Sequence, residues 1–177
     1  MTLIAEGKIT FVVQGTFYVS RHPDATLSTV LGSCISVCLF DPAAQIGGMN
    51  HFLLPAGRGE DSGHIRFGVN AMESLINLLL ANGATRGTLQ AKLFGGARIS
   101  ANLPDIGRAN AAFAHTFLRD EGIPCISESV GGNSARRVIF RPVTGQAKML
   151  FVLDNAVEST EMLQPRPSPP PGQVELF

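Results

Sequence analysis

"TLSTVLGSCISVCLFDPAAQIGGMNHFLL", residues 26–54, contains three apolar, β-branched segments separated by glycine and proline. Each of the segments 26–31, 34–40 and 47–54 predicts a strand, because such residues favour half-buried extended chain. Asp41-Pro42 and Gly47-Gly48 predict the turns between the last two. The stretch also holds a cysteine behind a Gly-Ser pair and a histidine seventeen positions later. It therefore predicts a run of antiparallel strands and contains the best candidates for chemistry.

Outward from this stretch, residues 8–20 predict a strand broken at Gly15. Two helices are expected, over 69–84 and 106–122. The first carries an apolar stripe at helical spacing, made of Met72, Leu75, Ile76 and Leu79. Further short strands are expected at 88–97, 123–129, 136–142 and 148–153. Because helices and strands do not alternate regularly, we expect a mixed α+β fold with largely antiparallel strands, not a doubly wound parallel sheet.

Domain organisation follows from a change of composition near residue 155. Residues 1–154 are predicted to form one domain, which is an ordinary length for a single core. Residues 155–177 are Pro-rich and are expected to be extended or disordered. Within this tail, the segment QVELF (173–177) is a possible docking peptide, although a disordered end is the more common outcome.

Charge and hydropathy narrow the class of partner. Lys+Arg and Asp+Glu both number 14, so the chain lacks the basic footprint that nucleic acid requires. No apolar run is long enough to span a membrane, and the first residues do not resemble a signal peptide. Three cysteines are too few for a disulfide framework. We therefore expect a cytoplasmic protein with reduced thiols and no membrane insertion.

Of the three cysteines, Cys34 is the candidate for a functional role, because it follows a Gly-Ser pair. Cys38 and Cys125 lie within apolar strands, where a thiol is usually buried packing. A metal site or disulfide joining Cys34 and Cys38 fails, because four strand residues separate their Cα atoms by about 13 Å. A nucleophile needs a base, and a hairpin allows His51 to reach Cys34. Spacing alone leaves a buried, unreactive thiol the more common reading.

Two hydroxyls upstream, those of Ser28 and Thr29, are candidates for orienting the His51 imidazole. In the turn itself, backbone N–H groups around Gly32 and Ser33 are candidates for stabilising an oxyanion. Farther along the chain, Gly95 and Gly96 predict a turn or a wall of the substrate cleft. The pair Gly131-Gly132 carries the same two readings. Arg108 and Asn110 are expected either to cap the second helix or to contact substrate.

Six sequence blocks, in order, resemble the CheD family of chemoreceptor glutamine deamidases. They are TVLGSCISVCLFDP, GGMNHFLLP, AMESLINLLLANGA, AKLFGGA, IGRAN and GGNSARRVIFRPVTG, and the resemblance covers residues 7–153. It implies a mixed β-sandwich flanked by helices, related to bacterial toxin deamidases. It also implies Cys34 as nucleophile, His51 as base, and a third residue at Ser28 or its neighbour Thr29. The family needs no cofactor, so none is expected here.

The resemblance implies a reaction in which Cys34 attacks a receptor glutamine, releases ammonia and leaves glutamate after hydrolysis of a thioester. A receptor methyl ester is a second acyl substrate for the same chemistry. Methyl-accepting chemotaxis receptors are the implied partners, with a CheC-type phosphatase as a further one. Two alternatives remain: a non-catalytic module that docks on such partners, and a cysteine hydrolase of small molecules.

Overall fold

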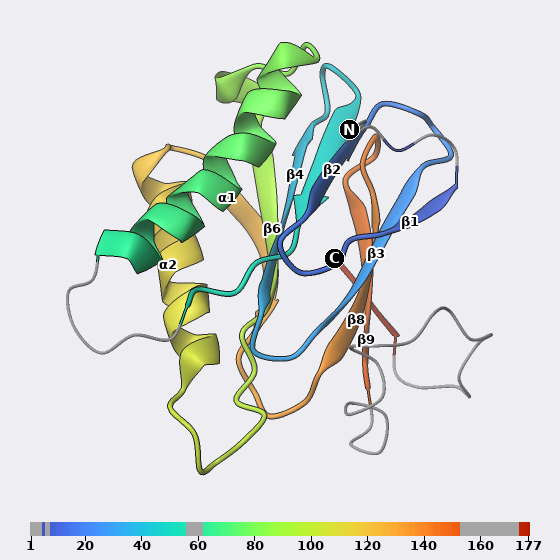
Figure 1. Cartoon of the computed structure of the whole chain (residues 1–177). Coiled ribbons are helices and arrows are strands. Elements are labelled where there is room, and N and C mark those ends of the chain that lie inside the picture. Colours follow the sequence, from blue (N-terminus) through green and yellow to red (C-terminus); the bar gives the residue numbers. More distant parts are fainter. Residues whose placement is uncertain (1–4, 6–7, 56–61, 153–173) are drawn as a thin grey trace.

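The computed structural model describes residues 5, 8–55, 62–152 and 174–177. Two five-stranded sheets pack face to face, and two helices cover the outer face of one of them (Figure 1). The molecule thus has three layers: helices, a first sheet and a second sheet. The predicted mixed, largely antiparallel α+β sandwich flanked by two helices is confirmed.

The first sheet, which lies beneath the helices, has the order β2-β5-β4-β6-β7. Its neighbours pair antiparallel except for β6 and β7, which are parallel. The strands are β2 (Phe17–Ser20), β4 (Ile35–Asp41), β5 (Ile46–Asn50), β6 (Gln90–Gly95) and β7 (Cys125–Val130). The strand pair predicted around the cysteine and the histidine is therefore central in this sheet.

The second sheet has the order β1-β3-β8-β9-β10. Its strands are β1 (Ile9–Phe11), β3 (Thr26–Leu31), β8 (Arg136–Arg141), β9 (Gln146–Phe151) and β10 (Val174–Leu176). Only β1 and β3 are parallel. Residues 155–173 of the predicted tail lie outside the described residues. The tail prediction needs correction at residues 174–176, which pair with β9 as an edge strand.

The helices are α1 (Ser62–Ala81) and α2 (Ile106–Asp120), with a short 3-10 turn at Arg86–Thr88. The predicted stripe of α1 is fully buried against the first sheet, at Met72, Leu75, Ile76 and Leu79. Helix α1 packs on β2 and β5, whereas α2 packs on β4, β6 and β7. Among the described residues, no helix is both long and apolar enough to cross a membrane.

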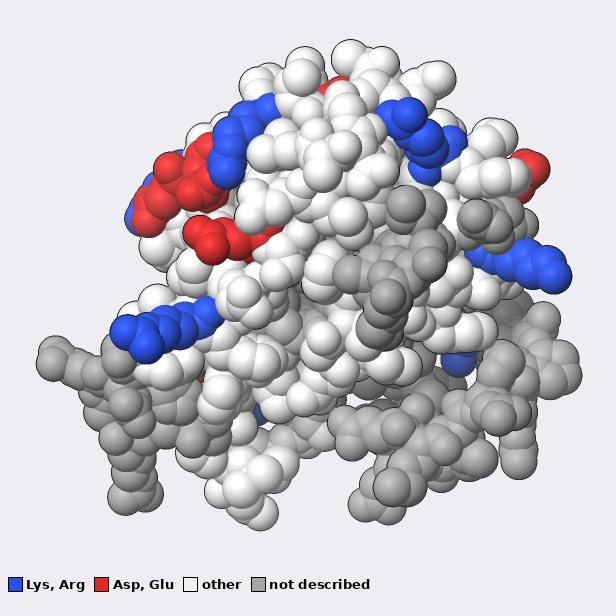
Figure 2. Space-filling view, turned by 45° about the horizontal axis from the view of Figure 1, so that its top comes forward, with Lys and Arg blue, Asp and Glu red and all other residues white. Residues whose placement is uncertain are grey.

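Strand alternation divides the interior into two cores. Along β4, Ile35, Val37 and Leu39 face the helices, whereas Cys38 and Phe40 face the second sheet. The second group joins the inter-sheet core, whose other members include Leu27, Leu31, Met49, Phe94 and Phe140. On the molecular face shown in Figure 2, basic and acidic side chains are interspersed among uncharged surface. This pattern agrees with the balanced charge of the sequence.

Candidate active site

The register of β4 and β5 places Cys34 and His51 on the same side of the first sheet. Ile35 lies opposite Phe52, and Cys38 lies opposite Met49. In this antiparallel register Ser36 faces His51, so Cys34 is the diagonal neighbour of His51. Diagonal neighbours are about 7–8 Å apart at Cα, within reach of long side chains. Both residues are almost buried, at 7% and 8% exposure.

A hydroxyl from the opposite sheet holds the imidazole of His51. Thr29 Oγ1 lies 2.8 Å from His51 Nδ1 and donates its own hydrogen to the carbonyl oxygen of Val12, at 2.7 Å. With that hydrogen used, Thr29 Oγ1 is the acceptor, and His51 Nδ1 is the donor. The Val12 oxygen lies 3.1 Å from the same nitrogen. The proton is thereby assigned to Nδ1, which leaves Nε2 as the basic nitrogen.

Ser28, the other predicted orienting residue, lies on the other face of β3. Its hydroxyl donates to the Val138 carbonyl of the neighbouring strand, at 3.1 Å. Residues 27, 29 and 31 share the face that meets the first sheet, because successive side chains of a strand alternate. The structure therefore brings Thr29, and not Ser28, to His51.

The turn before β4 is fixed through three consecutive carbonyl groups. The carbonyl oxygen of Gly32 accepts from Ala97 N, that of Ser33 from Asn110 Nδ2, and that of Cys34 from Gly96 N, at 2.8–2.9 Å. Across a trans peptide, the N–H points opposite to the preceding carbonyl. The N–H groups of Ser33 and Cys34 therefore point away from Ala97 and Asn110. This arrangement gives Gly32 and Ser33 a defined place beside the thiol.

Gly95 and Gly96 pack directly behind the cysteine. A Cβ atom on Gly95 would lie 2.1 Å from the Cys34 carbonyl oxygen, and both glycines have positive φ angles of 111° and 65°. Only glycine tolerates this combination of conformation and close approach. The predicted turn is present, and its closest contact is with the backbone of Cys34. Gly131 donates its N–H to the Gly95 carbonyl, so the second glycine pair adjoins the first.

Asn110 and Arg108, expected either to cap α2 or to contact substrate, differ in their surroundings. Asn110 is completely buried, and its carboxamide bridges the Ser33 carbonyl and the Leu54 N–H. It ties α2 to the chain on both sides of the cysteine–histidine pair. The side chain of Arg108 is exposed, while its N–H donates to Asp105, the N-cap of α2. The capping role expected for this part of the sequence therefore belongs to Asp105.

Gln14 is a site residue that no sequence pattern indicates. It lies in the exposed loop after β1, and its Oε1 is 3.5 Å from the Sγ of Cys34, which donates to it. A glutamine in a loop carries no periodicity or motif of its own. Its contact arises because β1 runs beside β3 and the following loop crosses to β5, where Gly15 N donates to the His51 carbonyl.

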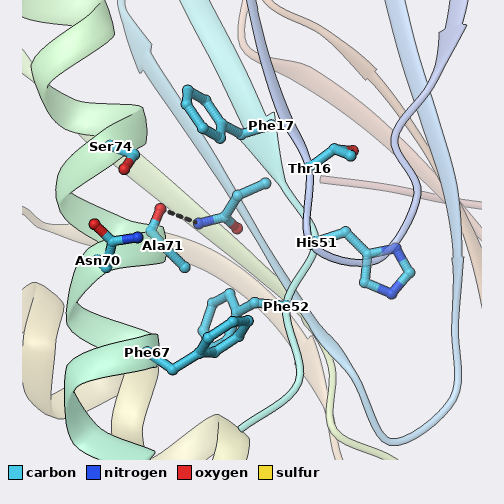
Figure 3. Close-up of a pocket in the computed structure, with 10 residues that line it drawn as sticks. Thr16, Phe17, His51, Phe52, Phe67, Asn70, Ala71 and Ser74 are labelled. Carbon is cyan, nitrogen blue, oxygen red and sulfur yellow. Dashed lines mark hydrogen bonds between the residues drawn. The ribbon is translucent and has the colours of Figure 1, made fainter. Parts of the chain in front are cut away.

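A small pocket of about 80 Å³ lies on the other side of the His51 backbone, between α1 and the first sheet. Phe67, Asn70 and Ser74 line it from α1, while the imidazole of His51 turns away from it (Figure 3). The imidazole and the pocket are thus on opposite sides of the chain at residue 51. Among the described residues, no three His, Cys, Asp or Glu side chains gather as metal ligands would.

The other two cysteines have surroundings that suppress ionisation. Burial raises the pKa of Cys38, outweighing the nearby Lys92. Burial also raises the pKa of Cys125, and Glu128 adds to the effect. A thiol with a raised pKa is a poor nucleophile at neutral pH. Their prediction as core residues agrees with full burial of Cys38 and partial burial of Cys125.

A family model and several sequence relatives match this chain, and they belong to one family. A family model described as "CheD chemotactic sensory transduction" matches residues 53–150. A probable chemoreceptor glutamine deamidase CheD from Cereibacter sphaeroides is 49% identical over 169 residues, covering 96% of this chain and 85% of the relative. One from Caulobacter vibrioides is 50% identical over 175 residues, covering 94% and 91%. The solved structure of Bacillus licheniformis hypothetical protein YfiH is 15% identical, with a TM-score of 0.45 over 70% of this chain and 60% of that one.

Proposed function

This chain belongs to the CheD family, and we propose that it is a deamidase that converts glutamine side chains of chemoreceptors to glutamate in the cytoplasm. The observation that carries the proposal is the contact between Thr29 Oγ1 and His51 Nδ1, on the side of the sheet that also holds Cys34. A nucleophile, a base and a group that orients the base are the parts that covalent acyl transfer needs. The family supplies the substrate: chemoreceptor glutamine is named in its relatives.

In the first half-reaction, His51 Nε2 takes the thiol proton and Cys34 Sγ bonds to the side-chain carbonyl carbon of the glutamine. The carbonyl electrons move to oxygen, which gives a tetrahedral oxyanion. When the oxyanion collapses, the C–N bond breaks, and the imidazolium donates its proton to the departing ammonia. A thioester between Cys34 and the receptor remains.

In the second half-reaction, His51 Nε2 takes a proton from water as the water oxygen attacks the thioester. Collapse of the second oxyanion breaks the C–S bond, the imidazolium returns its proton to the departing thiolate, and the new carboxylic acid ionises to glutamate. Throughout, Thr29 keeps Nδ1 protonated and the ring in place, so that the same nitrogen serves both steps. This role makes Thr29 a positioning residue.

The N–H groups of Ser33 and Cys34 are suited to the oxyanion. Their direction is fixed because the carbonyls of Gly32 and Ser33 are bonded from behind by Ala97 and Asn110. Fixed donors need no reorganisation when charge develops, and one such donor is worth about 10²–10³ in kcat. Buried Asn110 thus contributes by holding the turn.

Gln14 places a carboxamide against the thiol in the free protein. The carboxamide of a substrate glutamine has to approach the same sulfur, so we expect Gln14 to move aside when substrate binds. Because Gln14 is exposed, its side chain has room to move toward solvent.

The alternative is a binding module, docking on receptors or on a CheC-type phosphatase without catalysis. A receptor cytoplasmic fragment incubated with the protein separates the two, with released ammonia and cosedimentation measured together. We expect ammonia from the wild type only, while the wild type and Cys34→Ala both bind. Binding by both without ammonia from either would replace the enzyme with the module. Methanol released from a methylated fragment would report the esterase reaction in the same way.

A further inference from the structure

Lys92 is a cation in the core between the two sheets. It lies on β6 opposite Cys38 of β4, with 6% of its surface exposed and its Nζ 5.8 Å from the centre of the Phe40 ring. Burial lowers its pKa. Within the described part of the chain, no Asp or Glu side chain forms an ion pair with it. A lysine in such a place needs an oxygen partner, since an unpaired buried charge is costly.

The partner comes from the far end of the chain. Lys92 Nζ donates to the main-chain oxygen of Phe177. The ring of Phe177 meets Phe94, the next β6 residue on the same face, edge to face at a centroid distance of 5.6 Å. Residue 177 therefore packs against the core between the two sheets, with its ring on Phe94 and its oxygen on the buried lysine.

Main-chain pairing holds the residues that precede it. Val174, Glu175 and Leu176 pair antiparallel with Leu150, Met149 and Lys148 of β9. Beyond the strand, Phe177 and Ala147 exchange both backbone hydrogen bonds, at 3.1 and 3.3 Å. Addition of an extended segment to a sheet edge is a recurring mode of peptide recognition, in which main-chain bonds supply affinity and side-chain pockets supply specificity.

We propose that the β9 edge, Phe94 and Lys92 form a binding site for an extended peptide with an aromatic residue at the position of Phe177, and that residues 174–177 occupy it in the same molecule. The Pro-containing connection 153–173 tethers this occupant, which gives it an effective concentration of about millimolar. A free peptide therefore competes poorly with the attached segment. The site lies at the edge of the second sheet opposite β1 and is separate from Thr29 on β3.

The test is binding of a labelled peptide with the sequence of residues 172–177 to full-length variants, followed by fluorescence anisotropy. We expect Phe177→Ala protein to bind this peptide at least tenfold more tightly than the wild type, because its own segment no longer fills the site. Adding Lys92→Met to Phe177→Ala should abolish that gain. Lys8→Met, which changes an exposed lysine at the opposite edge of the sheet, should leave it intact. Equal, weak binding by all variants would overturn the proposal.

Hydrogen exchange gives a second readout that does not depend on added peptide. In the wild type, the amides of Ala147 and Phe177 should exchange slowly, and in Phe177→Ala both should exchange at least tenfold faster. Fast exchange at Ala147 already in the wild type would show that the segment does not dock.

Discussion

The hydroxyl of Thr29 links the two sheets, because it donates to the Val12 carbonyl and accepts from Nδ1 of His51, 2.8 Å away. Because the hydroxyl hydrogen is already used, this contact selects the tautomer in which Nε2 is basic. The inter-sheet packing of β3 against β5 thereby becomes part of the proposed chemistry.

Thr29→Val removes the nearer of the two oxygens beside His51 Nδ1 and keeps the shape of the side chain. We expect kcat to fall by about tenfold or more. The loss should stay below the about 10²–10⁴-fold acceleration that a positioned general base supplies in total. The acid limb of the pH profile of kcat/KM should move to lower pH, because the imidazolium loses an acceptor. Thr29→Ser, which keeps the hydroxyl, should leave kcat and the acid limb of the pH profile close to those of the wild type.

Ser28→Ala is the matched control for Thr29→Val, since it removes a hydroxyl from the adjacent residue. It should lower stability by about 1 kcal/mol, through loss of the hydrogen bond to Val138, and leave the pH profile unchanged. If Ser28→Ala shifted the pH profile and Thr29→Val left it unchanged, Ser28 and not Thr29 would be the residue that orients His51.

Gln14→Ala should uncover the thiol of Cys34. We expect alkylation of Cys34 by iodoacetamide to become faster by about twofold or more, because an exposed carboxamide no longer lies on the sulfur. Peptide mass spectrometry measures the rate. Cys38 and Cys125 serve as internal controls and should react slowly in both proteins, since burial raises the pKa of each. An unchanged rate at Cys34 would mean that Gln14 does not cover it.

Gly95→Ala should disrupt the turn behind the nucleophile. The new Cβ would meet the Cys34 carbonyl oxygen at 2.1 Å, in addition to the cost of a positive φ. Gly131→Ala is the matched control, because its φ is 75° but nothing lies within 4 Å of the added atom. Strain alone costs about 1–3 kcal/mol. In urea unfolding, Gly131→Ala should lower the free energy of unfolding by about this amount, and Gly95→Ala should lower it clearly more. Equal losses would refute the close contact.

Asp41 should make stability depend on pH. Burial works to raise its pKa, but donors from Thr88, Ala44, Thr85 and Ala43 prevail and hold that pKa below the ordinary 3.8. A depressed carboxyl pKa stabilises the fold above 3.8, and this contribution is lost as the pH falls through the lower, folded-state value. At neutral pH, Asp41→Asn should cost about 1–3 kcal/mol.

Urea unfolding of wild type and Asp41→Asn at neutral pH and again well below pH 3.8 measures this difference. The gap between the two proteins should narrow at the lower pH. Asp24→Asn, which changes an exposed carboxylate, should stay within about 0.5 kcal/mol of the wild type at both. A gap for Asp41→Asn that does not depend on pH would exclude the charge as its source.

Local pattern was enough to predict most elements of the fold. The β-branched segment 26–31 is the whole of β3, and the stripe from Met72 to Leu79 faces the core as helical spacing requires. The start of α1 was predicted too late, at residue 69 and not at 62, because the first turns carry exposed Ile65 and Phe67 and no buried stripe. Strand β10 was missed because a three-residue segment after a proline run has no periodicity to detect.

The parts of the site that were not predictable depend on contacts between distant segments. Ser28 and Thr29 are equivalent as neighbouring hydroxyls. Thr29 faces His51 because it shares a face of β3 with Leu27 and Leu31, which pack in the core between the sheets. Gln14 reaches Cys34 through the parallel pairing of β1 and β3, which nothing in either segment indicates. Asn110 was expected to cap α2 or to contact substrate, but its side chain donates to the Ser33 carbonyl instead.

The most direct test of the account is peptide mass spectrometry of a chemoreceptor cytoplasmic fragment after incubation with the protein. Wild type and Cys125→Ser should convert the same receptor glutamines to glutamate, whereas Cys34→Ala should convert none. Glutamate formed equally by Cys34→Ala, or no glutamate with any of the three, would contradict the proposal that Cys34 is the nucleophile of a receptor deamidase.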